Sequence, residues 1–422
     1  MLDIKFIREN PQKVQEACEK KNIDFDLGQL LRVDKKRREL IQAVEDMRAK
    51  KNRASEQIQR AKTQGEKDVI ILEMQELDKN NDRLDANMKE VDMEFDNLIS
   101  QVPNIPFDNV PVGKNDSENV PLEKVGKLKN FDFPAKDYMQ LAANLDLIDT
   151  ERAAKIAGSR FGFIKKEAAL LELALIKFAF DTLGKKGFIP VIPPVMIRPE
   201  MAKGMGFLQQ TNKEDAYYLQ QDDLYLTATS EQSLGTMHAG EIFEEEDLPR
   251  RYAGFSTCFR REAGSYGKDT KGIFRVHQFD KIEMFSFTKP EESKKEHQLL
   301  LSIERSLMDV LKLPYQIVHI CTGDLGTSAA EKYDIEGWLP SENRYRETHS
   351  TSNCTDFQSR SLNIRYQKKD GKTELIHTLN GTAFAIGRIL IMIIENYQQK
   401  DGSVKIPDVL QKYVGTKEIK RK

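Results

Sequence analysis

The sequence has few cysteines and histidines, and neither kind is arranged for a metal or redox centre. Cys18, Cys258, Cys321 and Cys354 are spread over 422 residues without the C-x-x-C spacing of zinc or thiol-redox motifs. The six histidines have no metal-ligand spacing either. This scatter argues against a disulfide framework and a structural zinc, so we expect free thiols and no zinc cofactor.

Long apolar runs are also missing. The opening MLDIKFIREN has no apolar signal region, and the longest apolar run, 389–394, is far shorter than the roughly 18 residues that suggest a membrane span. We therefore expect a cytoplasmic protein without membrane partners. Because the net charge is −2, nucleic acid would have to bind a local basic patch rather than the chain as a whole. With 39% hydrophobic residues, the chain can form two or three domains.

A heptad pattern dominates the first hundred residues. From position 30 to 61, apolar residues recur at alternating steps of three and four, interrupted only by Arg37 and Lys51. The pattern breaks around residues 63–65 and resumes from 70 to 98 with only Asn81 polar. Two matched helices joined by a glycine turn predict an antiparallel coiled-coil hairpin over about 28–100, with each arm roughly 45 Å long.

The charges of the two arms differ. Residues 30–62 carry eleven Lys and Arg against five Asp and Glu, whereas residues 66–98 carry four against eleven. One interpretation is that the arms simply neutralise each other across the hairpin. The other is that the first arm presents a cationic surface to an RNA backbone near the tip. The residues of that surface are Arg48, Lys50, Arg53, Arg60 and Lys62.

A proline-rich segment follows the hairpin. Between 101 and 126, four prolines lie among Asn, Asp and Gly, which is typical of a linker. We therefore expect an N-terminal domain over 1–105, a linker and entry segment over 106–130, and a catalytic domain over 131–422.

The most informative stretch, 256–285, is expected to form two antiparallel strands with a charged loop between them. If residues 252–262 form a strand, Arg260 and Glu262 share a face and Arg261 points the other way. A guanidinium can bind a phosphate there while the carboxylate binds a neutral ring beyond it; the alternative is a surface ion pair contributing about 0–1 kcal/mol. Glu283 lies in the apolar returning strand, so it needs a partner or a ligand.

The loop between these strands is basic and glycine-rich. Two residues separate Gly264 from Gly267, whereas a phosphate-binding Walker loop needs four residues between its first glycine and the Gly-Lys pair. With Lys268 and Lys271, the loop could instead close on a polyanion such as an RNA end.

Two other segments carry isolated polar residues. Thr229 and Glu231 are two apart, which puts them on one face if the chain is extended there. Arg388 is the only formal charge between Glu374 and Glu395, in a segment predicted to be a buried helix. A guanidinium in so apolar a helix needs an anion, either an internal carboxylate or a nucleotide polyphosphate.

The stretch FRREAGSYGKDTKGIFRVHQFDKIEMF, 259–285, resembles motif 2 of the class II aminoacyl-tRNA synthetases, in the wording of the seryl-tRNA synthetase family. Residues 168–194 resemble motif 1, the helix and strand of the dimer interface, and 377–398 resemble motif 3. The resemblance covers nearly the whole chain. It implies an α+β fold, with an antiparallel β-sheet catalytic domain flanked by helices and an N-terminal helical hairpin that grips tRNA.

The resemblance also implies a reaction and roles for residues. Serine and ATP would form seryl-adenylate, and serine would pass to the 3′ end of tRNA(Ser); whether tRNA(Sec) is also charged is left open. A homodimer and a Mg²⁺ ion brought with ATP are implied. The implied serine-binding residues are Thr229, Glu231, Arg260, Glu283 and Thr382. The implied ATP-binding residues are Arg260, Arg261, Glu262, Val276, Glu347, Thr348, His349, Ser350 and Arg388. Arg260, Glu262 and Arg388 would be catalytic, and Glu347 with Ser350 would hold the magnesium.

The sequence departs from the family's usual wording at Thr348, His349, Thr351 and Ala383. These departures keep open a catalytically altered paralogue that binds RNA. A ligase that charges a carrier protein with an amino acid is the other alternative, although such relatives lack the long arm and use zinc.

Overall fold

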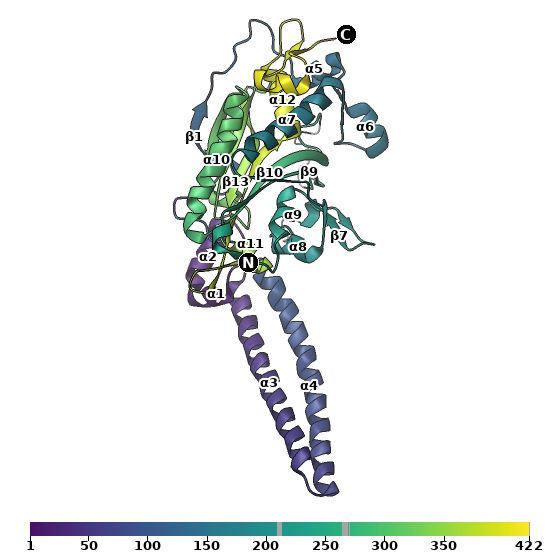
Figure 1. The fold of residues 1–422 in the computed structure, drawn as a ribbon, viewed down its shortest axis with the longest axis vertical. Coiled ribbons are helices and arrows are strands. Elements are labelled where there is room, and N and C mark those ends of the chain that lie inside the picture. Colours follow the sequence, from purple (N-terminus) through teal and green to yellow (C-terminus); the bar gives the residue numbers. More distant parts are fainter. Residues whose placement is uncertain (209–212, 264–268, 270, 422) are drawn as a thin grey trace. The chain divides into compact units, whose positions relative to one another are not determined.

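The computed structural model describes residues 1–208, 213–263, 269 and 271–421 (Figure 1). The chain divides into two compact units. One contains Leu2–Glu19 and Ile23–Val102, and the other contains Met1, Lys20–Asn22 and Pro103–Lys422. Gly264, Gly267 and Lys268 of the predicted loop lie outside the described residues. No helix in the described ranges is both long and apolar enough to cross a membrane.

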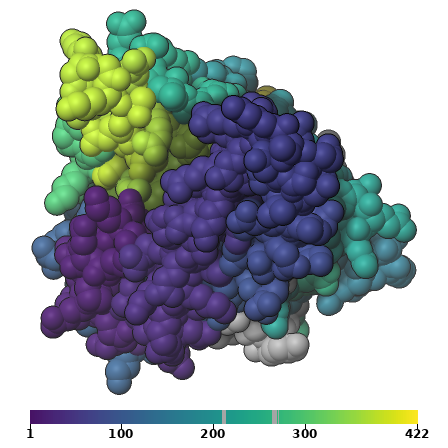
Figure 2. Space-filling model, turned by 90° about the horizontal axis from the view of Figure 1, so that it is seen from below, coloured from purple at the N-terminus to yellow at the C-terminus, as the bar shows by residue number. Residues whose placement is uncertain are grey.

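The first unit is helical, and its long hairpin confirms the heptad prediction. Its helices are α1 (Ile4–Glu9), α2 (Pro11–Lys20), α3 (Leu27–Arg60) and α4 (Gln64–Ile99). With 34 and 36 residues, α3 and α4 are about 51 and 54 Å long at 1.5 Å per residue. Figure 2 shows their surfaces side by side, in purple and blue, in the view from below. Apolar seam residues are buried, among them Leu30 and Val44 on α3 and Val91 and Phe95 on α4.

Two cations occupy seam positions on α3, and each is compensated by a carboxylate on α4. Arg37 Nε lies 2.7 Å from Asp92 Oδ1, and its guanidinium lies 4.8 Å from the centre of the Phe95 ring. Lys51 forms an ion pair with Asp78. Both pairs join α3 to α4, so these positions stabilise the hairpin across its seam.

The predicted glycine turn at the tip is wrong. The chain reverses over residues 61–63, and Gly65 lies inside the first turn of α4. Thr63 accepts from the Glu66 backbone N–H, and Glu66 accepts from the Thr63 N–H. This capping box satisfies the first amides of α4, so the turn needs no glycine.

The second unit is built on an eight-stranded sheet, in the order β1-β11-β12-β13-β16-β10-β9-β4. All neighbours are antiparallel except β4 and β9. The strands are β1 (Val120–Val125), β4 (Ile189–Val191), β9 (Arg250–Phe259), β10 (Gln278–Thr288), β11 (Tyr315–His319), β12 (Glu331–Leu339), β13 (Arg344–Asn353) and β16 (His377–Ala385). The predicted α+β architecture is therefore confirmed, and β4 is an edge strand of the sheet.

Helices pack against this sheet. Those of the second unit are α5 (Tyr138–Leu145), α6 (Thr150–Ala157), α7 (Lys166–Gly184), α8 (Pro199–Gly204), α9 (Ser230–Thr236), α10 (Ser293–Val310), α11 (Phe357–Leu362), α12 (Ile386–Asn396) and α13 (Asp408–Val414). The main core joins α7, α10 and α12 to the sheet. In Figure 1, α7 and α12 lie side by side and α10 runs along the sheet.

Short strands complete the second unit. They are β2 (Ile148–Asp149), β3 (Phe163–Ile164), β5 (Met196–Ile197), β6 (Tyr218–Leu219), β7 (Leu224–Leu226), β8 (Ile242–Glu244), β14 (Arg365–Gln367), β15 (Thr373–Leu375), β17 (Val404–Lys405) and β18 (Glu418–Ile419).

Three sequence expectations about local structure differ from the structure. The strand expected over 252–262 ends at Phe259, and Glu262 has a positive φ of 52°, which breaks the alternation of side chains. Thr229 and Glu231 are not extended, because Thr229 is the N-cap of α9 and Glu231 lies in its first turn. Part of the predicted linker, 120–125, is strand β1 of the main sheet.

Candidate active site

A cavity of about 390 Å³ opens on the main sheet and collects most of the residues predicted from sequence. The predicted residues that line it are Thr229, Glu231, Arg260, Glu262, Val276, Glu283, Glu347, Thr348, Ser350, Thr382 and Arg388. They come from segments up to 159 positions apart, with Thr229 at one end and Arg388 at the other (388 − 229). The sheet brings them together because β10, β13 and β16 are neighbours in its centre.

Two predicted ATP-binding residues are not brought into this cavity. The Arg261 guanidinium lies 4.7 Å from the centre of the Tyr217 ring, and its Nε donates to the Ala216 carbonyl. His349 is buried, with its Nδ1 2.8 Å from Thr348 Oγ1 and its ring 6.0 Å from that of Phe384. Burial lowers the pKa of His349 to about 3, so its ring is neutral at physiological pH.

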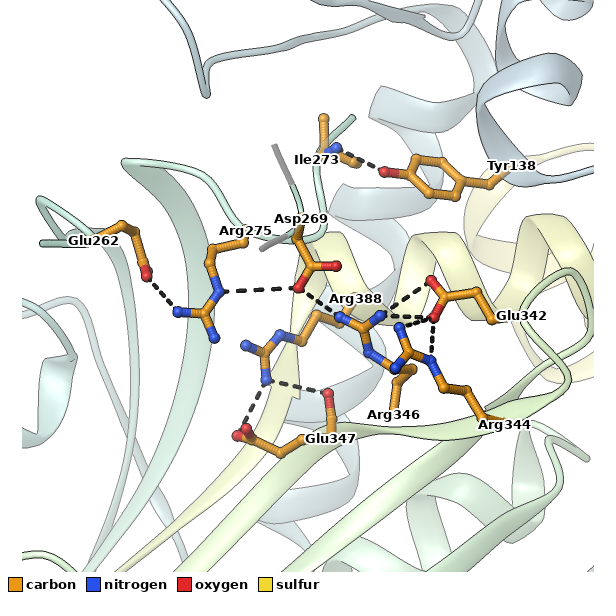
Figure 3. A network of polar contacts seen from close by, with 10 residues as sticks. All are labelled: Tyr138, Glu262, Asp269, Ile273, Arg275, Glu342, Arg344, Arg346, Glu347 and Arg388. Atoms are coloured by element: carbon orange, nitrogen blue, oxygen red, sulfur yellow. Dashed lines mark hydrogen bonds and ion pairs between the residues drawn. The ribbon is translucent and has the colours of Figure 1, made fainter. Parts of the chain in front are cut away.

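One end of the cavity is rich in guanidinium groups. Arg388 Nη1 lies 3.1 Å from Glu347 Oε1 and also donates to the Glu347 carbonyl (Figure 3). Burial pushes the pKa of Glu347 upward, but the charges of Arg388, Lys332 and Arg260 outweigh it and lower the pKa to about 2. Glu347 is therefore ionised, and Arg388 has the anionic partner that its apolar helix requires.

A chain of ion pairs continues from this end. Glu262 pairs with Arg275 at 2.8 Å, and Asp269 pairs with Arg346 at 2.6 Å (Figure 3). The guanidiniums of Arg346 and Arg388 lie 3.9 and 5.0 Å from the centre of the Phe274 ring. Cations beside an aromatic face suit a ligand that combines a flat ring with phosphates.

The other end of the cavity holds buried carboxylates. Glu283 is fully buried, and its oxygens lie 2.6 Å from Lys281 Nζ, 3.2 Å from Asn380 Nδ2 and 3.3 Å from Thr382 Oγ1. The sequence prediction that Glu283 needs a partner is therefore confirmed. These contacts hold the carboxylate in one orientation beside a hydroxyl and an amide.

Glu231 has weaker compensation than Glu283. Gln358 Nε2 donates to its Oε1 at 3.2 Å. Burial, and then the negative charge of Glu283, raise the pKa of Glu231 from 4.5 to about 7. A cationic ligand beside Glu231 would supply the charge that the empty cavity lacks.

Hard oxygen donors lie at the guanidinium-rich end. The Glu347 carboxylate and the Ser350 hydroxyl both line the cavity. Asp334, opposite Ser350 in the β12–β13 pair, is buried; its Oδ1 has no hydrogen-bond partner among the described residues but lies 3.6 Å from Lys332 Nζ. Oxygen ligands beside a polyphosphate suit Mg²⁺, which is usually held by one or two carboxylates and by the phosphates themselves. In the described ranges, no group of three His, Cys, Asp or Glu side chains is placed to hold a metal by itself.

Sequence reasoning missed several lining residues, namely Phe274, Arg275, Lys281, Lys332, Ser352 and Asn380. Lys281 could have been found, because it is two positions from Glu283 on the same predicted strand. Phe274 and Arg275 precede β10 in an irregular stretch that has no periodic pattern. Lys332 reaches the cavity from β12, whose sequence gives no local sign of a site.

The sequence of this chain is similar to those of one known protein family. The profile of the seryl-tRNA synthetase N-terminal domain matches residues 1–106, and that of the class II tRNA synthetase core domain (G, H, P, S and T) matches 217–397. A serine–tRNA ligase of Dictyoglomus turgidum is 43% identical, with all of both chains covered. One of Methanoregula boonei is 45% identical over 99% of this chain and all of its own length. The chain belongs to the seryl-tRNA synthetase family.

Solved structures of the seryl-tRNA synthetase family agree. The seryl-tRNA synthetase of Pyrococcus horikoshii complexed with ATP matches all of both chains with a TM-score of 0.89 and 40% identity. The cytoplasmic enzyme of Naegleria fowleri in complex with AMP matches with a TM-score of 0.85 and 33% identity, over all of this chain and 99% of its own. All the cavity residues predicted from sequence fall within the matched core domain.

The raised pKa of Glu231 predicts how stability depends on pH. Between pH 4.5 and about 7, the folded chain keeps a proton that the unfolded chain has lost, so this group's stabilisation is lost as pH rises through that window. The cost at pH 8 is about 3 kcal/mol. We expect Glu231→Gln to remove this cost, so that calorimetry at pH 5 and pH 8 finds the variant gaining stability relative to wild type at the higher pH.

The exposed Glu244→Gln is the matched control and should track wild type at both pH values. If Glu231→Gln also tracked wild type, Glu231 would be ionised in the cavity without penalty.

Proposed function

We propose that this chain activates L-serine with ATP, forming seryl-adenylate and pyrophosphate, and then transfers serine to the 3′ end of tRNA(Ser). The observation that carries the proposal is a single cavity with carboxylates at one end and guanidiniums around an aromatic ring at the other. The positive charge of Arg260 favours the ionised forms of both Glu231, whose pKa burial nevertheless raises, and Glu347, so it acts on both ends. This is the place where the serine carboxylate would meet the α-phosphate.

In the adenylation step, a serine carboxylate oxygen attacks the α-phosphorus, and the bond to the departing pyrophosphate breaks. Arg260 stabilises the charge that develops on the α-phosphate oxygens. Arg388 and Arg275 bind the outer phosphates, and the base lies against Phe274 near Glu262. When Mg²⁺ is bound with ATP at Glu347 and Ser350, it neutralises phosphate charge.

The carboxylate end recognises serine. Thr229 and Glu231 hold the ammonium group, which supplies the cation that Glu231 lacks. Glu283 and Thr382 hydrogen-bond the serine hydroxyl. Alanine would leave these buried polar groups unpaired, so rejection on the order of 10⁴-fold is expected without editing. Pyrophosphate exchange with alanine in place of serine checks this pocket, and comparable rates for the two amino acids would rule it out.

The rival functions have less support. Curated serine–tRNA ligases match over the whole chain, including the N-terminal hairpin, which carrier-protein ligases lack. The departures at Thr351 and Ala383 leave the charged groups of the cavity in place: the Thr351 hydroxyl donates to the Asn380 carbonyl, and Ala383 is fully buried. Because ATP, serine and tRNA meet in the cytoplasm, we place the protein there.

We assign tRNA binding to the N-terminal domain, 1–105, and catalysis to the catalytic domain. That domain was expected over 131–422, but it must also include β1, because this strand belongs to the main sheet. The described ion pairs between α3 and α4 use Arg37 and Lys51, whereas Arg48, Lys50, Arg53, Arg60 and Lys62 are all exposed. Arg60 pairs only within its own helix, with Glu56, among the described residues. These observations support an RNA-binding surface on α3 over simple neutralisation of α4.

A homodimer is the proposed assembly. Large apolar side chains are exposed over the motif 1 segment, with Leu173 62% and Ile192 80% exposed and with Leu170 and Ile189 also exposed. Such a patch marks an interface on a water-soluble chain.

Arg260→Ala tests the chemistry. We expect serine-dependent pyrophosphate exchange to fall about 100-fold or more, because one preorganised charge at the α-phosphate is lost. Arg261→Ala removes the neighbouring guanidinium, which lies outside the cavity, and should stay near wild type. Wild-type exchange by a folded Arg260→Ala protein would refute the role of Arg260.

Replacing Arg48, Lys50, Arg53 and Lys62 by Gln tests the hairpin. We expect a higher KM for tRNA and a shallower salt dependence, because fewer counterions are released on binding, while the KM values for serine and ATP stay unchanged. A control that removes the four cations of α4, Lys67, Lys79, Arg83 and Lys89, changes net charge equally and should affect tRNA less. Equal effects would mean that only overall charge matters.

Analytical ultracentrifugation tests the assembly. We expect wild type to sediment as a dimer at assay concentrations, and Leu173→Asp to shift it to monomer because a charge is placed within the apolar patch. Lys185 is exposed and directly follows α7. Lys185→Asp is therefore the control, and this variant should remain a dimer. A wild-type monomer with full activity would contradict the proposal.

A further inference from the structure

A buried histidine that packs behind the main sheet makes contacts that have no role in the reaction proposed above. His297 lies on α10 and is completely buried. Its Nδ1 is 3.2 Å from Glu331 Oε2 on β12, and its Nε2 is 3.2 Å from the Thr351 carbonyl oxygen on β13. Because a carbonyl oxygen can only accept, Nε2 must carry a proton and donate it to Thr351.

Glu331 fixes the other side of the ring. Its Oε1 accepts from Asn109 Nδ2 at 2.5 Å and from the Tyr333 hydroxyl at 3.1 Å. Burial pushes the pKa of Glu331 upward, but hydrogen bonds from His297 and Asn109 outweigh it and lower the pKa to about 2. Glu331 Oε2 faces Nδ1 and the Thr351 carbonyl faces Nε2, so both ring nitrogens have hydrogen-bond partners and the orientation of the ring is fixed.

The contacts of Thr351 continue toward the cavity. Its hydroxyl donates to the Asn380 carbonyl at 2.9 Å, and Asn380 Nδ2 donates to Glu283 Oε1 at 3.2 Å. Ser350 and Ser352, on either side of Thr351, line the cavity. Thus an unbroken series of hydrogen bonds leads from His297 through two strands to the carboxylate in the serine pocket.

We infer that His297 is a positioning residue for the serine pocket, acting through Thr351 and Asn380 on Glu283. The inference rests on the proposed serine activation. Its physical basis is that a hydrogen-bonded carboxylate selects a hydroxyl only if its own orientation is fixed. His297 does not line the cavity, so its loss should change how well serine is recognised and leave ATP binding unchanged.

Two amide variants distinguish the roles of the two ring nitrogens. Gln places its amide nitrogen near the position of Nε2, whereas Asn places it near Nδ1. We expect His297→Gln to keep the donation to Thr351 and a near-normal KM for serine. His297→Asn should keep the Glu331 contact, lose the Thr351 contact and raise the KM for serine about 5- to 10-fold, the size of one hydrogen bond. The KM for ATP should not change in either variant.

His319→Asn is the matched control. His319 Nε2 lies 3.6 Å from the same Glu331, and its ring stacks on Tyr333 at 4.5 Å, but its Nε2 has no hydrogen-bond partner among the described residues. The KM for serine should therefore stay at the wild-type value. Should the His297 variants fail to fold, Thr351→Val, which removes only the hydroxyl that holds Asn380, should raise the KM for serine in the same way.

All proteins are compared in the serine-dependent exchange assay. If wild type shows no exchange, the proposed function itself fails. If wild type is active but a folded His297→Asn or Thr351→Val protein has the wild-type KM for serine, the positioning role is wrong. Equal rises in the KM for serine and ATP, or equal effects of the Gln and Asn variants, would likewise overturn it and indicate a purely structural histidine.

Discussion

Charge compensation inside one cavity is the constraint on which this site depends. A charged group taken out of water is costly unless an opposite charge or several hydrogen bonds replace the solvent. In the empty cavity, Lys281 compensates Glu283, and Arg388 compensates Glu347. Glu231 has only an amide donor and the distant charges of Lys281 and Arg260, and its raised pKa records that deficit.

The same constraint explains how substrates can enter such a polar cavity. Phosphate oxygens can replace carboxylates as partners of Arg388 and Arg275, so those guanidiniums exchange one anion for another. An ammonium group beside Glu231 would supply the positive charge that this carboxylate lacks. We therefore expect the raised pKa of Glu231 to reduce the stability of the fold at neutral pH, and a cationic ligand beside Glu231 to offset that cost.

How much of this could be predicted from sequence depended on whether the signal was local. The hairpin was predictable because its heptad pattern runs over 30–61 on one arm and 70–98 on the other, and two of its three exceptions, Arg37 and Lys51, have partners on the facing helix. Glu283 and Arg388 were predictable because a charge within an apolar segment must be compensated. The strand end at Phe259 and the helical start at Thr229 were not, because tertiary contacts decide both. Lys332 and Asn380 were missed because only the order of strands in the sheet brings them to the cavity.

Two departures from the family's wording lie where the sheet is irregular. Thr348 is the extra residue between the Ile335–His349 and Glu336–Glu347 pairs, and Ala383 is the extra residue between the Ile282–Phe384 and Glu283–Thr382 pairs. A bulge re-aims the side chains next to it. Glu347 and Thr382, the neighbours of these bulges, both line the cavity; Thr348 also lines it, but its hydroxyl donates to the Ile335 carbonyl. The irregular backbone sets the direction of the neighbouring side chains. The side chain at the bulge itself only has to fit the space available to it. Thr348 and Ala383 are thus compatible with Glu347 and Thr382 lining the cavity.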